Sequence, residues 1–530
     1  MTTRPQVRPL GAQISHMLKS RGVDVIFGIP GVHNQEMYRG IEEAGITHVL
    51  ARHEQGAGFM ADGYARASGK PGVADVITGP GLCNIMTPMG QAYSDSVPVL
   101  VISSCLDETS ARRGQLHQML DQEGAARTVC DWSYEARDAG AVYHLVDRAL
   151  AEFEGARPRP KHIQVPIHAL EGQAHAAPAA PRPEMARAVP ESAVQLVAEA
   201  LNAAKAPILV LGGGSVSSAE AWQEVLQRTG AASFTTIAGK GVVRRDDPLS
   251  FGTYLARPDS ADVFARADLV LAVGTELSEN DMWRVELGHQ GRLIRVDIDP
   301  EQLNSMPGTS EGVLCDAAAL AEGLLQQDLR TSNGWDTAGV AAARARWLAE
   351  VDAGTPGVIP VAQALAAVLP DETMIYSDMT TFAYAATETW DMPRPGHWHH
   401  PNGFGTLGYA MPAAIGGCMA RKGLPTLAIA GDYGFQYTLQ ELGAAVEMKL
   451  PLPILLWDNG KLKAIEDSMV SAQIAPNAVI AHNPDFCALA KAYGVNAEAP
   501  KDIAALQKAV LEAFKADGPT LIYATPQMVG

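Results

Sequence analysis

Residues 426–465 read "TLAIAGDYGFQYTLQELGAAVEMKLPLPILLWDNGKLKAI", and this stretch decides the fold. Two apolar runs, at 426–431 and 452–458, have the length and composition of buried strands. Between them, Thr438 and Glu441 form a Thr-x-x-Glu capping pattern that predicts the start of a helix. The apolar residues expected on the buried face of that helix are Leu439, Leu442 and Val446. The stretch therefore predicts one β-α-β unit of a parallel sheet.

Oxygen-bearing side chains follow both predicted strands. Asp432 ends the first strand, and Asp458 and Asn459 end the second. Ligands of parallel sheets gather beyond the carboxyl ends of the strands, and carboxylate and amide oxygens suit Mg²⁺. On these residues alone, a pair of ordinary strand-end caps is an equally open interpretation. The histidines at 397–400 have no carboxylate or cysteine partners nearby, so we interpret that segment as a loop.

Alternating strand and helix patterns extend over the whole chain of 530 residues. They predict an α/β protein with three doubly wound parallel-sheet domains. The predicted domains are 5–175, 190–330 and 355–530. Residues 173–192 are rich in Ala and Pro, as is typical of a linker, and the Ala-rich segment 340–354 predicts a helix that leads into the third domain.

The central domain carries three glycines after its first strand, in "GGGSVS" at 212–217. This pattern is not the GxGxxG of dinucleotide-binding domains. It favours a structural, nucleotide-like domain over a working NAD site.

Composition excludes several classes of function. The net charge of −18 argues against nucleic acid or an anionic membrane as a partner. No apolar run reaches the roughly 18 residues of a membrane span. The six cysteines lie far apart without a CxxC pattern, which favours reduced thiols in a cytoplasmic protein.

Several motifs together resemble the thiamine-diphosphate-dependent enzymes of the acetolactate synthase, benzoylformate decarboxylase and pyruvate oxidase group. They are "GDYGF" followed by "WDNGKL", "FGIPG" (27–31), "RHEQGAGFMADGYARASGKPGV" (52–73), "TGPGLCN" (78–84) and "GFGTLGYAMPAAIGG" (403–417). The resemblance covers most of the chain. It implies that the three domains are a pyrimidine-binding, a central and a diphosphate-binding domain.

The resemblance implies thiamine diphosphate as cofactor, with Mg²⁺ held by Asp432, Asn459 and the backbone oxygen of Lys461. Two positions depart from the usual motif: Tyr433 stands where a glycine is usual, and Asp458 stands where an asparagine is usual. Because Tyr adopts positive φ poorly, the first departure predicts an altered turn after Asp432. The residues that the resemblance assigns to cofactor binding are Pro30, Gly31, Glu54, Thr380, Thr381, Gly405, Leu407, Gly431, Asp432, Tyr433, Gly434, Asn459 and Lys461.

The other end of the cofactor is expected at Glu54, which matches the glutamate that hydrogen-bonds the aminopyrimidine ring. Leu407 matches the apolar wedge that bends the cofactor, and the Gly405 carbonyl matches an acceptor for its amino group. Glu54 and Asp432 lie in different domains, and in this family each cofactor lies between domains of different subunits. The resemblance therefore implies a homodimer or homotetramer with shared active sites.

Asn84, His117 and Gln118 match positions that approach the substrate in relatives. His117 replaces a Phe-like residue of acetolactate synthases, which weakens the synthase interpretation; it is either a proton relay or a surface histidine. Phrases such as "GIPGVHNQEMYRG" resemble 5-guanidino-2-oxopentanoate decarboxylases. A guanidinium tail needs a carboxylate partner. The candidates are Glu466, Asp467 and Asp121, each of which is otherwise a plain solvent-facing acid.

We expect a thiamine-diphosphate-dependent, non-oxidative decarboxylase that converts a 2-oxo acid to an aldehyde. The alternatives are an acetolactate-synthase-like carboligase that joins two 2-oxo acids, and a catalytically silent binding or regulatory subunit. Retention of Glu54, Asp432 and Asn459 argues against the silent subunit. The sequence leaves FAD binding in the central domain undecided.

Overall fold

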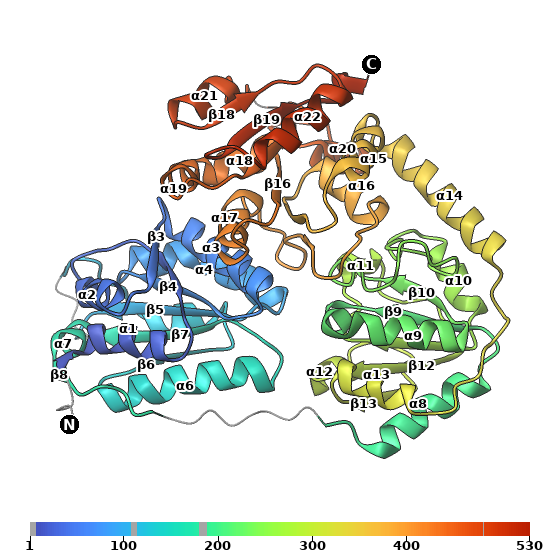
Figure 1. Ribbon diagram of the computed structural model, residues 1–530, viewed down its shortest axis with the longest axis horizontal. Coiled ribbons are helices and arrows are strands. Elements are labelled where there is room, and N and C mark those ends of the chain that lie inside the picture. The colour runs from blue at the N-terminus through green and yellow to red at the C-terminus, as the bar shows by residue number, and fades with distance from the viewer. Residues whose placement is uncertain (1–6, 108–113, 180–187, 481, 530) are drawn as a thin grey trace.

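The computed structural model describes residues 7–107, 114–179, 188–480 and 482–529. The predicted outer domain boundaries at residues 5 and 530 lie outside this range. Three α/β domains, each built on its own parallel sheet, form the corners of a triangle, coloured blue, green and red in Figure 1. The expectation of three doubly wound parallel-sheet domains is confirmed. Among the described helices, none is long and apolar enough to cross a membrane.

The N-terminal sheet has the strand order β3-β2-β4-β5-β7-β6, and a short antiparallel pair, β1 with β8, lies beside it. Apolar residues of the central strands are fully buried between two layers of helices. Its strands are β1 (Arg8–Pro9), β2 (Val25–Gly28), β3 (Thr47–Leu50), β4 (Gly72–Val76), β5 (Val99–Cys105), β6 (Trp132–Glu135), β7 (Lys161–Pro166) and β8 (Gln173–Ala174). Its helices are α1 (Leu10–Ser20), α2 (Gln35–Glu43), α3 (Glu54–Ser68), α4 (Pro80–Ser94), α5 (Gln122–Arg127), α6 (Ala139–Gly155) and α7 (Ile167–Glu171).

The central sheet has the order β10-β9-β11-β12-β13, all parallel. Its strands are β9 (Pro207–Leu211), β10 (Ala232–Thr235), β11 (Leu269–Val273), β12 (Arg292–Asp297) and β13 (Glu311–Leu314). Its helices are α8 (Glu191–Ala203), η1 (Gly213–Ser218), α9 (Ala219–Thr229), α10 (Ser260–Arg266), α11 (Glu279–Met282), α12 (Pro300–Leu303) and α13 (Ala317–Leu325). The long helix α14 (Thr337–Gly354) then runs along the outside of the molecule to the third domain (Figure 1).

The C-terminal sheet has the order β15-β14-β16-β17-β19-β18. Numbered along the chain, this order matches that of the N-terminal sheet, so the two domains share one topology. Its strands are β14 (Met374–Ser377), β15 (Trp398–His399), β16 (Thr426–Gly431), β17 (Pro453–Trp457), β18 (Asn496–Glu498) and β19 (Thr520–Ala524). Its helices are α15 (Val358–Val368), α16 (Thr381–Thr389), α17 (Ala410–Ala420), α18 (Asp432–Thr438), η2 (Leu439–Glu441), α19 (Leu442–Glu447), α20 (Lys463–Ser471), α21 (Phe486–Ala492), α22 (Ile503–Ala513) and η3 (Pro526–Val529).

The predicted capping box after Asp432 is wrong. A helix begins directly at Asp432, and a 3-10 turn (η2) separates it from α19. The Thr438 hydroxyl donates to the Gly408 carbonyl oxygen at 2.8 Å instead of capping a helix. The Glu441 carboxylate accepts hydrogen bonds from the backbone of the N-terminal domain. Both side chains of the pattern therefore form hydrogen bonds with residues that lie far away in the sequence.

The histidine segment is also not a simple loop. His399 belongs to strand β15, which pairs with β14, and both His399 and His400 are buried. Burial lowers the pKa of His400 to about 3, so this ring is neutral at physiological pH.

The N-terminal and C-terminal domains meet where α3 packs against α17, at the centre of Figure 1. The two backbones touch: a methyl group on Gly63 would lie 1.9 Å from the Ala413 carbonyl oxygen, and one on Gly416 would lie 1.9 Å from that of Met60. The Tyr376 hydroxyl donates to the Gly63 carbonyl at 2.7 Å across the same contact. The domain arrangement therefore requires glycine at these positions.

We predict that Gly63→Ala lowers stability by about 1–3 kcal/mol or more, because the added methyl group meets a backbone that cannot move away. Gly354→Ala is the matched control, since Gly354 ends α14 with open space around it and should change stability by less than about 1 kcal/mol. Chemical or thermal unfolding of both variants checks this. Equal stability of Gly63→Ala and wild type would contradict the proposed backbone contact.

Candidate active site

Polar side chains gather at the carboxyl ends of two sheets. One group, in the C-terminal domain, surrounds Asp432, and the other, in the N-terminal domain, surrounds Glu54. The strand register pairs Gly431 with Trp457, so Asp432 and Asp458 leave neighbouring strands at the same level, as predicted for the β-α-β unit.

An asparagine that the sequence did not predict connects the side chains of the C-terminal group. Asn483 donates its side-chain amide to Asp432 Oδ2 at 2.7 Å and to Asp458 Oδ1 at 3.0 Å. Asn459 Oδ1 accepts from the Lys461 amide at 3.2 Å, and its Nδ2 donates to Thr381 Oγ1 at 3.3 Å. The structure thus links the proposed metal-binding loop to a predicted phosphate-binding threonine.

Burial raises the pKa of Asp432 to about 6; the hydrogen bond from Asn483 opposes this rise and the charge of Asp458 adds to it. No group of three or more His, Cys, Asp or Glu side chains that would suit a metal occurs in the described parts of the chain. A cation here would therefore depend on one carboxylate together with amide and backbone oxygens. This donor set fits Mg²⁺, which accepts few protein ligands and keeps waters or phosphate oxygens.

Tyr433 does not distort the turn, contrary to the sequence expectation. Positions 432–438 are regular α-helix, and neither Tyr433 nor Gly434 has a positive φ. Gly434 is needed for close approach: a methyl group there would lie 2.6 Å from Asp378 Oδ2. Gly405, in contrast, does adopt the left-handed region, with φ of 65°.

Asp378 is a second residue that sequence reasoning missed. Its buried carboxylate accepts from the Met379 amide at 2.8 Å and from the Gly408 amide at 2.9 Å. Burial raises its pKa to about 6, whereas these backbone hydrogen bonds oppose the rise. Asp378 therefore ties the segment before Thr380 to the loop that carries Gly405 and Leu407.

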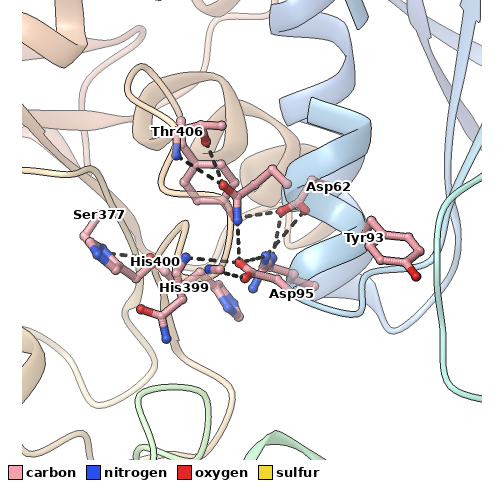
Figure 2. Close-up of polar contacts among 12 residues, drawn as sticks. Asp62, Tyr93, Asp95, Ser377, His399, His400 and Thr406 are labelled. Atoms are coloured by element: carbon pink, nitrogen blue, oxygen red, sulfur yellow. Dashed lines mark hydrogen bonds and ion pairs between the residues drawn. The ribbon is translucent and has the colours of Figure 1, made fainter. Parts of the chain in front are cut away.

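Figure 2 shows how that loop is also held by the N-terminal domain. Asp95 accepts from the Gly403 amide at 2.9 Å, and Gln91 Oε1 accepts from the Thr406 hydroxyl at 2.8 Å. Asp62 accepts from the Tyr409 hydroxyl at 2.7 Å. Arg66 bridges the two acids, donating to Asp62 at 2.7 Å and to Asp95 at 2.8 Å. The predicted wedge, Leu407, thus lies in a loop fixed from both sides.

In the N-terminal group, Glu54 is the first residue of α3 and is only 8% exposed. Asn84, on α4, donates its amide to Glu54 Oε2 at 2.8 Å. The structure therefore brings together two of the residues predicted for catalysis.

A buried acid of the C-terminal domain positions the start of α3. Glu441 accepts from the Arg52 amide at 3.0 Å and from the His53 amide at 2.9 Å. Burial raises the pKa of Glu441 to about 7, and the two amide hydrogen bonds oppose this rise. Because Arg52 and His53 directly precede Glu54, these hydrogen bonds to Glu441 fix the backbone from which Glu54 begins α3.

His117 is half-buried and packs edge-on against His33, with ring centroids 5.1 Å apart. Neither Nδ1 has a hydrogen-bond partner among the described residues, and His117 has a positive φ of 63°. Burial lowers the pKa of His33, and His117 lowers it further. The His117 backbone lies against Gly79 and the Glu54 carboxylate lies near Gly81, so the pair offers two imidazoles close to the start of α4 that also adjoins Glu54. Gln118 Oε1 instead accepts from the Gly114 and Gln115 amides, so it holds its own loop.

The three acids predicted for a guanidinium tail already have partners within the chain. Lys461 Nζ contacts Glu466 at 2.7 Å, and Lys463 contacts Asp467. Asp121 caps α5 by accepting from the Gly124 amide at 2.7 Å. Any of them would have to exchange a partner to bind a cationic substrate.

Comparison with known proteins gives matches along most of the chain. Models of the thiamine pyrophosphate enzyme domains match at 8–125 (N-terminal TPP binding domain), 194–324 (central domain) and 378–524 (C-terminal TPP binding domain). The probable 2-ketoarginine decarboxylase AruI of Pseudomonas aeruginosa is 43% identical, over 97% of this chain and 93% of that protein. The large subunits of acetolactate synthase isozymes 1 and 2 of Escherichia coli are each 27% identical, over 98% and 97% of this chain and 95% of each subunit.

The pKa of Glu441, raised from its ordinary value of 4.5, predicts a pH dependence of stability. The folded protein holds this proton more tightly than the unfolded chain, so stability falls as pH rises from about 4.5 to 7. Glu441→Gln removes that dependence, and its stability relative to wild type should rise by on the order of 3 kcal/mol over this range.

Unfolding midpoints of both proteins at pH 5 and pH 8 measure this difference. Glu322→Gln, which removes an exposed carboxylate of α13 in the central domain, is the control for loss of charge. A difference between Glu441→Gln and wild type that does not change with pH would refute the buried, proton-holding state of Glu441.

Proposed function

The chain belongs to the thiamine pyrophosphate enzyme family, and on this premise we propose that it is a non-oxidative decarboxylase that converts a 2-oxo acid to an aldehyde. The observation that carries the proposal is the full-length relative at 43% identity, a probable 2-ketoarginine decarboxylase. We therefore propose 5-guanidino-2-oxopentanoate, or an oxo acid of similar shape and charge, as the substrate.

When bound, thiamine diphosphate with Mg²⁺ supplies the nucleophilic carbon and the electron sink that decarboxylation needs. Asp432, Asn459 and the Lys461 carbonyl would hold the cation, and Thr380 and Thr381 would donate to the diphosphate. Glu54 would hold a proton at a carboxyl oxygen facing the aminopyrimidine ring, while Asn84 keeps the other oxygen occupied. Gly405 and Leu407 would set the bend of the cofactor.

His117 and His33 are proposed to move a proton at the substrate end. Neither Nδ1 atom has a hydrogen-bond partner in the described part of the chain, and both rings are half-buried. Both observations support this role, since an imidazole can give or take a proton near neutral pH. Delivery of a proton by this pair would give an aldehyde as the product, which distinguishes the proposed function from carboligation.

We propose that the active sites are shared between two copies of the chain in a homodimer or homotetramer. Apolar side chains beside the histidine pair are largely exposed in the single chain: Val32 (61%), Leu116 (61%) and Leu120 (74%). Helix α20, which follows the proposed metal loop, has no buried residue. Such exposed apolar surface supports a partner that covers it.

The central domain is proposed to be structural, with no FAD in the reaction. A dinucleotide would bind where the strand order reverses, between β9 and β11. There the Gly212 amide donates to the Val273 carbonyl at 2.9 Å and the Gly214 amide donates to the Gly274 carbonyl at 3.0 Å. Two glycine amides at this point are thus used within the fold, which supports the proposal, and a purified protein should lack flavin absorbance.

Product analysis tests the function. The protein, supplied with thiamine diphosphate and Mg²⁺, is incubated with 5-guanidino-2-oxopentanoate, pyruvate and other 2-oxo acids, and products are separated by mass. We expect an aldehyde and carbon dioxide, with the guanidino acid preferred. The 27% identical acetolactate synthases make carboligation the alternative, and a condensed hydroxy acid as the main product would replace our proposal with it.

The role of Glu54 predicts that Glu54→Gln slows exchange of the cofactor C2 proton by about 10²–10⁴-fold, because the proton-holding carboxyl is lost. Exchange into deuterated solvent, followed by NMR, measures this rate. Cofactor affinity, measured by calorimetry, should change little, and Glu322→Gln, at an exposed position of α13, should exchange like wild type. Wild-type exchange in Glu54→Gln would remove Glu54 from the mechanism.

A further inference from the structure

Asn483 lies 51 residues after Asp432 in the chain, yet it reaches the centre of the proposed cation site. The segment that carries it returns to the metal loop after α20: the Leu462 amide donates to the Val479 carbonyl at 2.8 Å, and Lys461 forms an antiparallel bridge with Ile480. The return of the chain places Asn483 between the ends of β16 and β17.

Both polar atoms of the Asn483 side chain form hydrogen bonds. Its Nδ2 donates to Asp432 and Asp458, and its Oδ1 accepts from Gln436 Nε2 at 3.3 Å. Gln436 Nε2 also donates to the Asp432 carbonyl at 3.0 Å. One asparagine therefore connects both strand ends with helix α18.

Asp458 brings a second carboxylate beside Asp432, since both accept from the same Asn483 amide. Three donors use its two oxygens: Asn483 Nδ2 and the Gly460 amide at Oδ1, and the Tyr523 hydroxyl at Oδ2 at 2.9 Å. These contacts turn Asp458 toward protein donors. Without Asn483, the two carboxylates would repel each other with less compensation, and Asp432 would lose the donor that fixes its Oδ2.

We propose that Asn483 is a positioning residue of the divalent-cation site, which compensates for Asp458 by holding it as a hydrogen-bond acceptor and by orienting Asp432 as the ligand. This inference rests on the proposed cofactor site. Residues that orient metal ligands typically contribute 10–100-fold to metal affinity, and we expect an effect of about this size.

The test is a double-mutant cycle in which Mn²⁺ affinity, and not enzymatic activity, is measured. Mn²⁺ replaces Mg²⁺, and electron paramagnetic resonance measures the Mn²⁺ affinity of the full chain in the presence of thiamine diphosphate. Asn483→Ala should weaken Mn²⁺ binding about 10–100-fold. In the Asp458→Asn background, where the extra charge is gone, the same change should weaken Mn²⁺ binding clearly less than in wild type, because only the direct contact with Asp432 is lost.

Asn477→Ala is the matched control, since Asn477 lies exposed in the same segment and its amide donates to the nearby Ala475 carbonyl, away from Asp432 and Asp458. If wild type fails to bind Mn²⁺ with thiamine diphosphate, the proposed function itself is wrong. If wild type binds and Asn483→Ala matches Asn477→Ala, only the role of Asn483 is refuted. An equal loss in both backgrounds, including one from general misfolding, refutes its action through Asp458.

Discussion

The direct backbone contact between α3 and α17 is the constraint on which the rest of the structure depends. Glycines at 63 and 416 let the two helices approach until the backbones touch. Helix α3 begins at Glu54, and α17 follows the loop that carries Gly405 and Leu407. In the proposed dimer, Glu54 and this loop belong to two different shared sites, so a shift of one helix along the other would displace a part of each site.

Buried acids then fix the segments that leave the helix pair. Glu441 holds the amides before Glu54, Asp378 holds the loop before α17, and Asp95 holds the same loop from the N-terminal domain. All three accept backbone hydrogen bonds across long distances in the sequence. Burying a carboxylate is costly unless donors surround it, so each acid is compatible with one arrangement of the chain and makes that arrangement specific.

Sequence reasoning recovered what local patterns encode and missed what distant partners decide. The β-α-β unit, the three doubly wound domains and the approach of Asp432 to Asp458 follow from strand composition and spacing. The capping pattern at Thr438 and Glu441 gave a wrong prediction of a helix start. The Thr438 hydroxyl instead donates to the Gly408 carbonyl, and Glu441 accepts from the amides at 52 and 53. Asp378 and Asn483 had no local signal at all. Tyr433 was mispredicted, because Gly434 serves close packing and not a left-handed turn.

The central claim is that Glu54 of one subunit and Asp432 of another act on one cofactor molecule, and subunit complementation tests it most directly. Glu54→Gln and Asp432→Asn chains, each inactive alone, are co-expressed so that mixed dimers form, and decarboxylation is measured. In each mixed dimer one site carries both changes and the other neither, so random pairing predicts recovery of about a quarter of wild-type activity. Co-expressed chains that stay as inactive as each variant alone would contradict the shared site.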